Sequence, residues 1–455
     1  MKFKLTPPKN ENQLLFSNHD LVKLMIPLIA EQFLMIFVGL VDTAMVSRLS
    51  EAAVSGVSLV DMINQLIIQI LAALGTGGAV ISSQYIGHRE PHKACEAANQ
   101  LIILVILIGL GIMAFFLSLR QPILRLFFGS IDDDVMREAL TYMTISAISY
   151  PFIALYASST AIFRSMKKTH IALIMSALMN VINVICNLIF IFGLDMGVAG
   201  AALGSLIGRG TAGTAACLML LSHKHPVHLV KPEGKILEGA MVKRILYIGI
   251  PNGLENGMFQ LGKILVASII SLFGTVQIAA NAVAGNVAGL GIIPGFAIGL
   301  ALVTVIGQCV GAGDYEQAEY YTKKMMRIAM IIMFLYNGAI LLLRPVIISA
   351  YVLSEETAAL ANTLMTLHAA CAMFLWVPAF TLPNALRASN DVKFTMTTSI
   401  VSMWVFRVGF SLILGKYLGW GAVGVWISMI LDWIFRLSLF IWRFKSKKWQ
   451  RVKLI

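Results

Sequence analysis

Apolar stretches long enough to cross a lipid bilayer constrain this chain more than any other feature of its sequence. A spanning helix needs about 20 mostly apolar residues, and turn-like or charged breaks separate twelve such segments. They lie at 20–46, 53–82, 94–117, 135–162, 170–192, 197–220, 245–272, 278–308, 318–342, 357–384, 394–416 and 421–443. Only 13% of the residues are charged, against about 25% in a typical soluble domain. The sequence predicts an all-α integral membrane protein with twelve transmembrane helices.

The basic residues lie mostly on one side of the predicted membrane. Few occur at the helix ends of the opposite side: Arg48, Arg120, Arg125, Arg137, Arg344 and Lys416. Such a bias marks the cytoplasmic side of a membrane protein. We therefore expect a multi-pass protein of the cell inner membrane or plasma membrane with both termini in the cytoplasm. The formal charge of +12 then follows from membrane topology, and no nucleic-acid partner is expected.

The chain matches itself at an offset of 224 residues. Pro27 falls on Pro251 and Gly197 falls on Gly421 in the same register. Because the offset spans an even number of helices, both halves have the same topology, as in transporters built from parallel repeats. A duplicated scaffold without a transport role is the alternative. The predicted parts are an N-terminal six-helix lobe at 1–220, a cytoplasmic linker at 221–244 and a C-terminal six-helix lobe at 245–455.

Several ionisable side chains fall inside the predicted spans, where each is costly in lipid and so a functional candidate. The first half has Glu31, Asp42 and Asp61 with one base, Arg209, and the second has Glu255 and Asp432 with Lys263, Arg407 and Arg436. Similar depth along the helices predicts that Glu31 pairs with Arg209. In the second half it predicts pairs of Glu255 with Arg407 or of Asp432 with Arg436. It also predicts a permanent network of Glu255, Arg407 and Asp432.

Asp42 and Asp61 have no predicted basic partner at their own depth. An unpaired carboxylate in a low dielectric must bind a proton or a cation. Asn183 and Asn187, one helical turn apart, and Ser205 lie in the same outer portion of the predicted membrane. Their oxygens suit a hard cation such as Na⁺.

Plainer roles stay open for the same residues. Asp42 could reach interfacial water or Arg48, and Asp61 could face a water-filled cavity. The two asparagines could serve as polar contacts between helices.

Four sequence motifs belong together: "FVGLVDTAMVSRLS", "SSQYIG", "NVICNLIFIFGLDMGVAGAALGS" and "IGQCVGAGDYEQA". With these motifs the sequence resembles the multidrug and toxic compound extrusion (MATE) transporters of bacterial type. The resemblance implies export of organic cations and amphipathic compounds in exchange for Na⁺ or H⁺. It implies that Asp42 is a coupling residue and that Asn183, Asn187 and Ser205 complete a cation site. Asn187 stands where family members often have Asp.

The second half fits the family less closely. Glu255 matches in type the helix-seven acid of NorM-type members, but their helix-ten acid has no counterpart between Thr357 and Asn384. The resemblance therefore favours a coupling site in the first half.

We expect a monomeric secondary active antiporter in which a cavity between the halves takes up small amphipathic or cationic molecules. Membrane lipid is its other partner, and the coupling ion replaces any cofactor. A lipid-linked oligosaccharide flippase of the same superfamily is the nearer alternative, although it would need a more cationic cavity. A membrane-embedded enzyme is the alternative of another class, but HExxH, GxSxG and paired CxxC motifs are absent and the five cysteines are scattered. A channel is a further alternative, but the repeat offers no loop like a selectivity filter.

Overall fold

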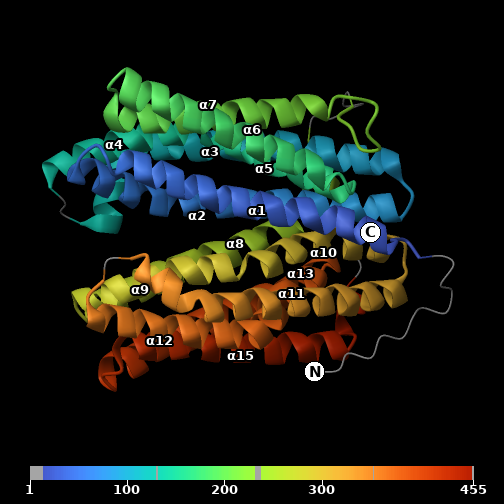
Figure 1. Ribbon diagram of the computed structural model, residues 1–455. Helices are drawn as coiled ribbons and strands as arrows, with labels where there is room; N and C mark the ends of the chain where they lie inside the picture. Colours follow the sequence, from blue (N-terminus) through green and yellow to red (C-terminus); the bar gives the residue numbers. More distant parts are fainter. Residues whose placement is uncertain (1–13, 130–131, 231–236, 352, 453–455) are drawn as a thin grey trace. The chain divides into compact units, whose positions relative to one another are not determined.

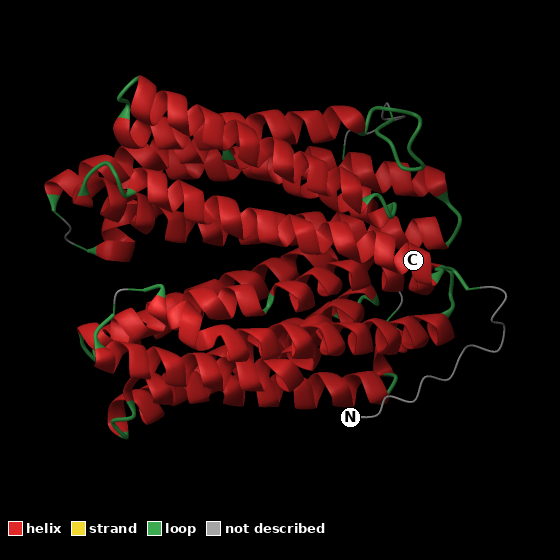
Figure 2. Cartoon of the chain, in the orientation of Figure 1, coloured by secondary structure: helices red, strands yellow, loops and turns green. Residues whose placement is uncertain are grey.

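The computed structural model describes residues 14–129, 132–230, 237–351 and 353–452, and every regular element in these ranges is helical (Figure 1 and Figure 2). Residues 231–236 of the predicted linker lie outside the described ranges. The first elements are α1 (Asn18–Val46), α2 (Glu51–Gly87), α3 (Pro91–Phe128), α4 (Asp133–Ile148), α5 (Tyr150–Ser165), α6 (Thr169–Asn187), η2 (Leu188–Gly193) and α7 (Gly197–Met219). After the linker come α8 (Gly239–Ser271), α9 (Thr275–Gly291), α10 (Ile293–Gly311), α11 (Tyr315–Ser349), α12 (Glu355–Cys371), η3 (Ala372–Thr381), α13 (Leu382–Ala388), α14 (Val392–Val401), η4 (Ser402–Gly409), η5 (Ser411–Tyr417), α15 (Gly421–Lys445) and η6 (Lys448–Arg451).

Each predicted span coincides with one helix or with a run of consecutive helices. By length and apolar character alone, nine helices of the described chain could cross a membrane, or ten if the bent pair α4 and α5 forms one span. α7 and α8 fall outside this count because glycines and charged side chains such as Arg209 and Lys263 lower their hydropathy. The predicted all-α membrane fold is confirmed.

The backbone contacts divide the described chain into two compact units. The N-terminal unit comprises Val22–Asn256, and the C-terminal unit comprises the described residues up to Leu21 and those from Gly257 onward. Both α1 and α8 therefore contribute to both units. The predicted lobe boundaries at 220 and 245 stay a prediction.

The internal repeat appears in the backbone angles as well as in the sequence. Gly197 and Gly421, at the starts of α7 and α15, both have φ of +57°. Asp195 and Gly419, two residues earlier in each half, have φ of +51° and +71°. A positive φ is uncommon, above all for a residue other than glycine such as Asp195. Two positive φ angles at equivalent positions of both halves therefore indicate that the halves share one chain path.

Local sequence explains where several helices begin. The Ser50 side chain accepts a hydrogen bond from the Ala53 amide at 3.0 Å and caps the start of α2. α4 and α5 meet at Ser149 with a bend of 46°. Pro151, in the first turn of α5, explains this break because it has no N–H to donate to the carbonyl four residues earlier and its ring would clash with that carbonyl in a continuous helix. The bend positions Ser149 for a contact with Arg209.

Within the N-terminal unit, α2 and the first part of α8 approach at backbone distance. A Cβ atom placed on Gly77 would lie 2.7 Å from the carbonyl oxygen of Ile245 and 2.9 Å from the amide nitrogen of Gly249. Small residues at such contacts let membrane helices pack closely. No side chain fits at Gly77 unless one helix moves.

We predict that Gly77→Ala lowers the stability of the protein, because the added methyl group forces α2 away from α8. Overpacking of this kind costs about 1–3 kcal/mol and is measured as a lower thermal unfolding midpoint in detergent. Gly111→Ala is the matched control, since Gly111 also lies inside a helix but has no atom within 4 Å of the new methyl group. Equal midpoints for the two variants would contradict the proposed close packing.

Candidate functional site

Asp42 meets two amide side chains from α6. The Asn187 Nδ2 atom donates a hydrogen bond to Asp42 Oδ1 at 2.9 Å. Turning the Asn183 amide so that its nitrogen faces Asp42 places that nitrogen 2.8 Å from Oδ1, while its oxygen accepts from the Ser205 hydroxyl at 3.1 Å. This orientation gives both Asn183 atoms suitable partners, which is the basis for assigning amides of near-identical shape. The four residues predicted to form one site therefore do lie together.

One side-chain atom of this cluster has no hydrogen-bond partner among the residues that the structure describes. The Asn187 Oδ1 atom is buried and accepts no hydrogen bond within the described chain. A buried acceptor without a donor is uncommon in folded proteins. Across the described residues, no group of three or more His, Cys, Asp or Glu side chains is placed to hold a metal. A cation at Asp42 would therefore bind one carboxylate together with neutral oxygens.

Glycines of α7 make room for the two asparagines. A Cβ atom on Gly204 would lie 2.0 Å from Asn187 Oδ1, and one on Gly208 would lie 3.2 Å from Asn183 Cβ. The spacing of four residues puts both glycines on one face of α7. Neither glycine was among the predicted site residues, although the G-x-x-x-G pattern from 204 to 208 is a known signal of close helix packing.

Asp61 has its own hydrogen-bonding partners. Its Oδ1 atom accepts from Asn64 Nδ2 and from the Tyr142 hydroxyl, each at 3.2 Å. The Tyr150 hydroxyl in turn donates to Asn64 Oδ1 at 2.9 Å. Asn64, Tyr142 and Tyr150 are buried, and none of the three was predicted from the sequence. Tyrosines inside apolar helices carry no sequence signal that separates a hydrogen-bonding role from packing.

The expected pair of Glu31 with Arg209 is wrong. Glu31 Oε1 lies 2.6 Å from the Arg164 guanidinium, while Arg209 donates to the Ser149 hydroxyl at 2.9 Å. Arg209 also acts electrostatically on both Asp42 and Asp61, so neither carboxylate is remote from a base. Depth along a helix does not identify its neighbours, and a long arginine side chain reaches well beyond its own turn.

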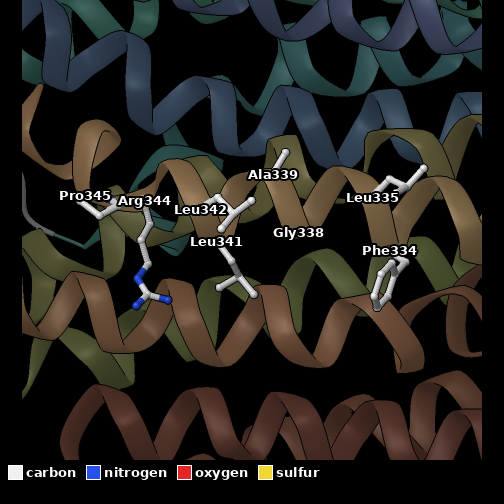
Figure 3. Close-up of a pocket in the computed structure, with 8 residues that line it drawn as sticks. All are labelled: Phe334, Leu335, Gly338, Ala339, Leu341, Leu342, Arg344 and Pro345. Carbon is white, nitrogen blue, oxygen red and sulfur yellow. The ribbon is translucent and has the colours of Figure 1, made fainter.

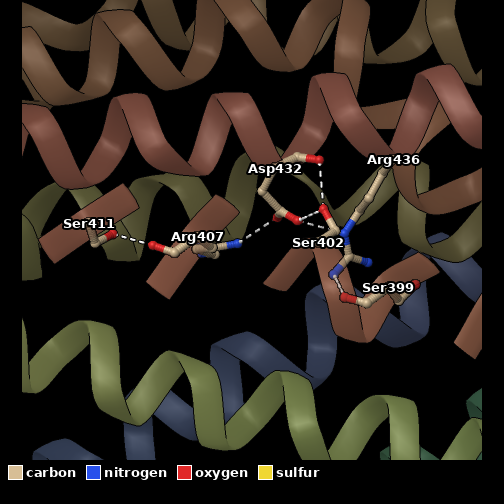
Figure 4. Close-up of polar contacts among 6 residues, drawn as sticks. All are labelled: Ser399, Ser402, Arg407, Ser411, Asp432 and Arg436. Carbon is tan, nitrogen blue, oxygen red and sulfur yellow. Dashed lines mark hydrogen bonds and ion pairs between the residues drawn. The ribbon is translucent and has the colours of Figure 1, made fainter. Parts of the chain in front are cut away.

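In the C-terminal unit the charges form a tight network around Asp432 (Figure 4). Arg436 Nε lies 2.9 Å from Asp432 Oδ1, and Ser402 donates to the same carboxylate oxygen. Arg407 is farther away, with 3.8 Å between its Nη1 atom and Asp432 Oδ2. Asp432 and Arg436 thus form one of the expected pairs. Glu255 belongs to the N-terminal unit, so its predicted place in this network stays a prediction.

Two shallow surface hollows are lined by other residues than these clusters. A hollow of about 710 Å³ follows α11 from Phe334 to Pro345, and its residues all come from that one helix (Figure 3). A second hollow of about 420 Å³ is lined by residues of α3 and α4, including Arg120 and Thr144. Neither contains a predicted site residue, and the apolar character of the first suits contact with lipid.

Two six-helix repeats with charged and amide side chains inside their apolar helices define a membrane transporter rather than a soluble enzyme. The family model described as MatE matches residues 27–189 and 251–413, two segments that begin and end 224 residues apart. The chain therefore belongs to the MatE family of transporters, and both the resemblance and the repeat are confirmed.

Relatives match along nearly the whole chain. This chain is 26% identical to the "Uncharacterized transporter YisQ" of Bacillus subtilis, and the match covers 98% of each chain. It is 25% identical to the "Probable multidrug resistance protein NorM" of Thermotoga maritima, covering 95% of this chain and 93% of the relative. Among solved structures, an "Outward-facing conformation of a multidrug resistance MATE family transporter of the MOP superfamily" matches with a TM-score of 0.88. That match has 22% identity and covers 94% of this chain and 96% of the other.

We predict that Arg436→Gln destabilises the protein more than Arg407→Gln does. Asp432 is fully buried, and loss of Arg436 leaves its charge with the hydrogen bond from Ser402 and with Arg407 at 3.8 Å as its only basic group among the described residues. Breaking a buried ion pair from one side costs about 3–5 kcal/mol. Thermal unfolding midpoints of the purified variants measure the difference.

Adding Asp432→Asn to Arg436→Gln should restore part of the lost stability, since it removes the uncompensated carboxylate. If Arg407→Gln proves the more destabilising variant, Arg407 rather than Arg436 is the principal partner of Asp432.

Proposed function

We propose that this chain is a secondary active efflux transporter that exports small amphipathic or cationic molecules in exchange for Na⁺ or H⁺ bound at Asp42. The proposal rests on two observations among the described residues: the buried Asn187 Oδ1 accepts no hydrogen bond, and Asp42 next to it receives its hydrogen bonds from amides. The NorM relative is described as a probable multidrug resistance protein, and the matching solved structure is that of a multidrug resistance transporter. Both similarities support a function in drug export.

The amide groups around Asp42 suit reversible binding of a proton or a Na⁺ ion. While Asp42 is ionised, the nitrogens of Asn183 and Asn187 donate to it. A proton on Asp42 would make the carboxyl a donor, and Asn187 Oδ1, which now lies against Gly204, would accept from it once the Asn187 amide turns over. A Na⁺ ion would draw on the same oxygen together with Asp42 and the Ser205 hydroxyl, which are the ligand types that hard cations prefer.

Cation binding would change which helices are linked at this site. In the structure, the amide groups of Asn183 and Asn187 on α6 donate to Asp42 on α1. A bound cation would instead be coordinated by oxygens of α1, α6 and α7. A ligand shifts a conformational equilibrium only through its different affinity for the two states. We propose that the cation and the exported molecule favour opposite states, and that this competition couples their movements.

Charge in the N-terminal unit favours this function over that of a flippase. Asp42 and Asp61 face one base, Arg209, which suits a cation better than a pyrophosphate. Asn187 in place of an acid limits the site at Asp42 to one carboxylate, so a single monovalent cation neutralises it. We propose that the protein is a monomer surrounded by lipid in the cell membrane. Both termini are placed in the cytoplasm because the basic residues lie mostly on one side of the predicted membrane.

We predict that Asp42→Asn abolishes gradient-driven export of ethidium from proteoliposomes. The variant removes the charge that attracts the coupling cation and leaves a neutral side chain of the same size. Export is measured under a Na⁺ gradient and then under a pH gradient, so that the wild-type response identifies the ion. Asp195→Asn is the matched control, since Asp195 is exposed in the turn before α7 and should retain full coupling.

Asn183→Ala and Ser205→Ala should raise the cation concentration needed for half-maximal export more than they change the affinity for ethidium. Full coupling in the Asp42→Asn variant would place the coupling site elsewhere.

We further predict that Gly204→Ala impairs cation dependence although residue 204 carries no ligand. A methyl group there would lie 2.0 Å from Asn187 Oδ1, so the amide must move away from Asp42. The expected result is a higher half-maximal cation concentration in the same assay. Gly210→Ala, on the same helix with no atom within 4 Å of the added methyl, should behave as wild type, and equal behaviour of both variants would argue against a role for Asn187.

A further inference from the structure

The charged cluster of the C-terminal unit contains more positive charge than its own carboxylate needs. Arg436 already neutralises Asp432 at 2.9 Å and also donates to the Ser399 carbonyl at 3.0 Å. Ser402 contributes a further hydrogen bond to Asp432. Arg407 therefore adds a second positive charge to a carboxylate that is already paired (Figure 4).

The Arg407 side chain has no hydrogen-bond acceptor in the described part of the chain. Its guanidinium carries five N–H groups, and within the described residues its side chain makes no hydrogen bond, only the 3.8 Å approach to Asp432. Its side chain is only 15% exposed, so water replaces few of the missing partners. Lys263 of α8 is near enough to interact electrostatically with Arg407 and forms no ion pair in the described part of the chain. Together they leave an excess of positive charge.

Aromatic rings lie against this excess charge. The guanidinium carbon of Arg407 is 5.5 Å from the centre of the Phe259 ring, and that of Arg436 is 5.3 Å from the same ring. Phe380 packs edge-on against Phe259 at 6.1 Å and stacks on Trp376 at 5.2 Å. The cluster thus combines a cationic group with a flat apolar surface.

We propose that Arg407 and Phe259 form a binding site for a small aromatic anion, with its carboxylate or sulfonate on the guanidinium and its ring against Phe259. Guanidinium groups form strong bidentate hydrogen bonds with such anions. Of the Asp432 carboxylate, Arg436 and Ser402 contact only Oδ1. Arg407 faces the buried Oδ2, which accepts no hydrogen bond from the described residues, but 3.8 Å is too long for Arg407 to supply one, so its N–H groups stay free for an anion. That the bound anion is exported cargo rests on the proposed function, whereas binding itself does not.

The test compares two probes that differ in charge. Naphthalene-2-sulfonate and 2-naphthyl-trimethylammonium are equilibrated by dialysis with the purified full-length protein in non-ionic detergent, and protein-free micelles correct for partition. We expect the wild type to bind the sulfonate more tightly than the trimethylammonium probe. Arg407→Gln should weaken sulfonate binding about tenfold or more, as expected for loss of hydrogen bonds to a charged group, and leave the trimethylammonium probe unaffected.

Lys416→Gln is the charge-matched control, since Lys416 is exposed at the end of η5 and its removal should leave sulfonate binding unchanged. If Arg407→Gln fails to fold, Phe259→Leu serves instead and should weaken sulfonate binding. Equal wild-type affinity for both probes, or sulfonate binding that is insensitive to Arg407, would overturn the proposal. No ion gradient enters the measurement, so a failure of coupling at Asp42 would leave its outcome unchanged.

Discussion

The cost of charge in a low dielectric is the constraint on which the arrangement of this protein depends. Asp432 and Glu31 are held directly by guanidinium groups, at 2.9 Å and 2.6 Å. Asp42 instead receives its direct hydrogen bonds from amides. A fixed cation satisfies a carboxylate permanently, whereas amide donors can be replaced by a proton or an ion. The kind of partner therefore separates structural carboxylates from an exchangeable one.

Close helix packing determines where these polar groups can meet. Gly204 and Gly208 bring α7 against α6 so that the two asparagines lie beside both Ser205 and Asp42. The bend between α4 and α5 also positions a polar group, because the Ser149 hydroxyl at the bend accepts a hydrogen bond from Arg209. Backbone features with no chemistry of their own thus fix the geometry of the charged groups. Changes at such positions should affect function without removing any ligand.

Apolar length and the repeat predicted the spans, the offset and the duplicated plan, because all of these are one-dimensional properties of a chain in a bilayer. The association of Asp42 with Asn183, Asn187 and Ser205 was also predicted, with support from the family resemblance. The partner of Glu31 was not, because depth supplies one coordinate and Arg164 approaches from a neighbouring helix. Tyr142 was missed for a related reason, since its role depends on which helix faces Asp61. Asn64 lies three residues after Asp61 on the same helix, so its spacing was visible in the sequence.

Duplication followed by divergence explains why the ionisable side chains inside the predicted spans sum to −2 in the first half of the sequence and to +1 in the second. At the repeat offset Asn183 corresponds to Arg407, so a neutral group beside a carboxylate in one half becomes a guanidinium in the other. A guanidinium stays ionised at any accessible pH and cannot leave the protein. It would repel a second coupling cation, which favours a single exchangeable cation site in the N-terminal unit. The same permanent charge is the reason for proposing an anionic ligand in the C-terminal unit, so that one backbone plan would support two different binding preferences.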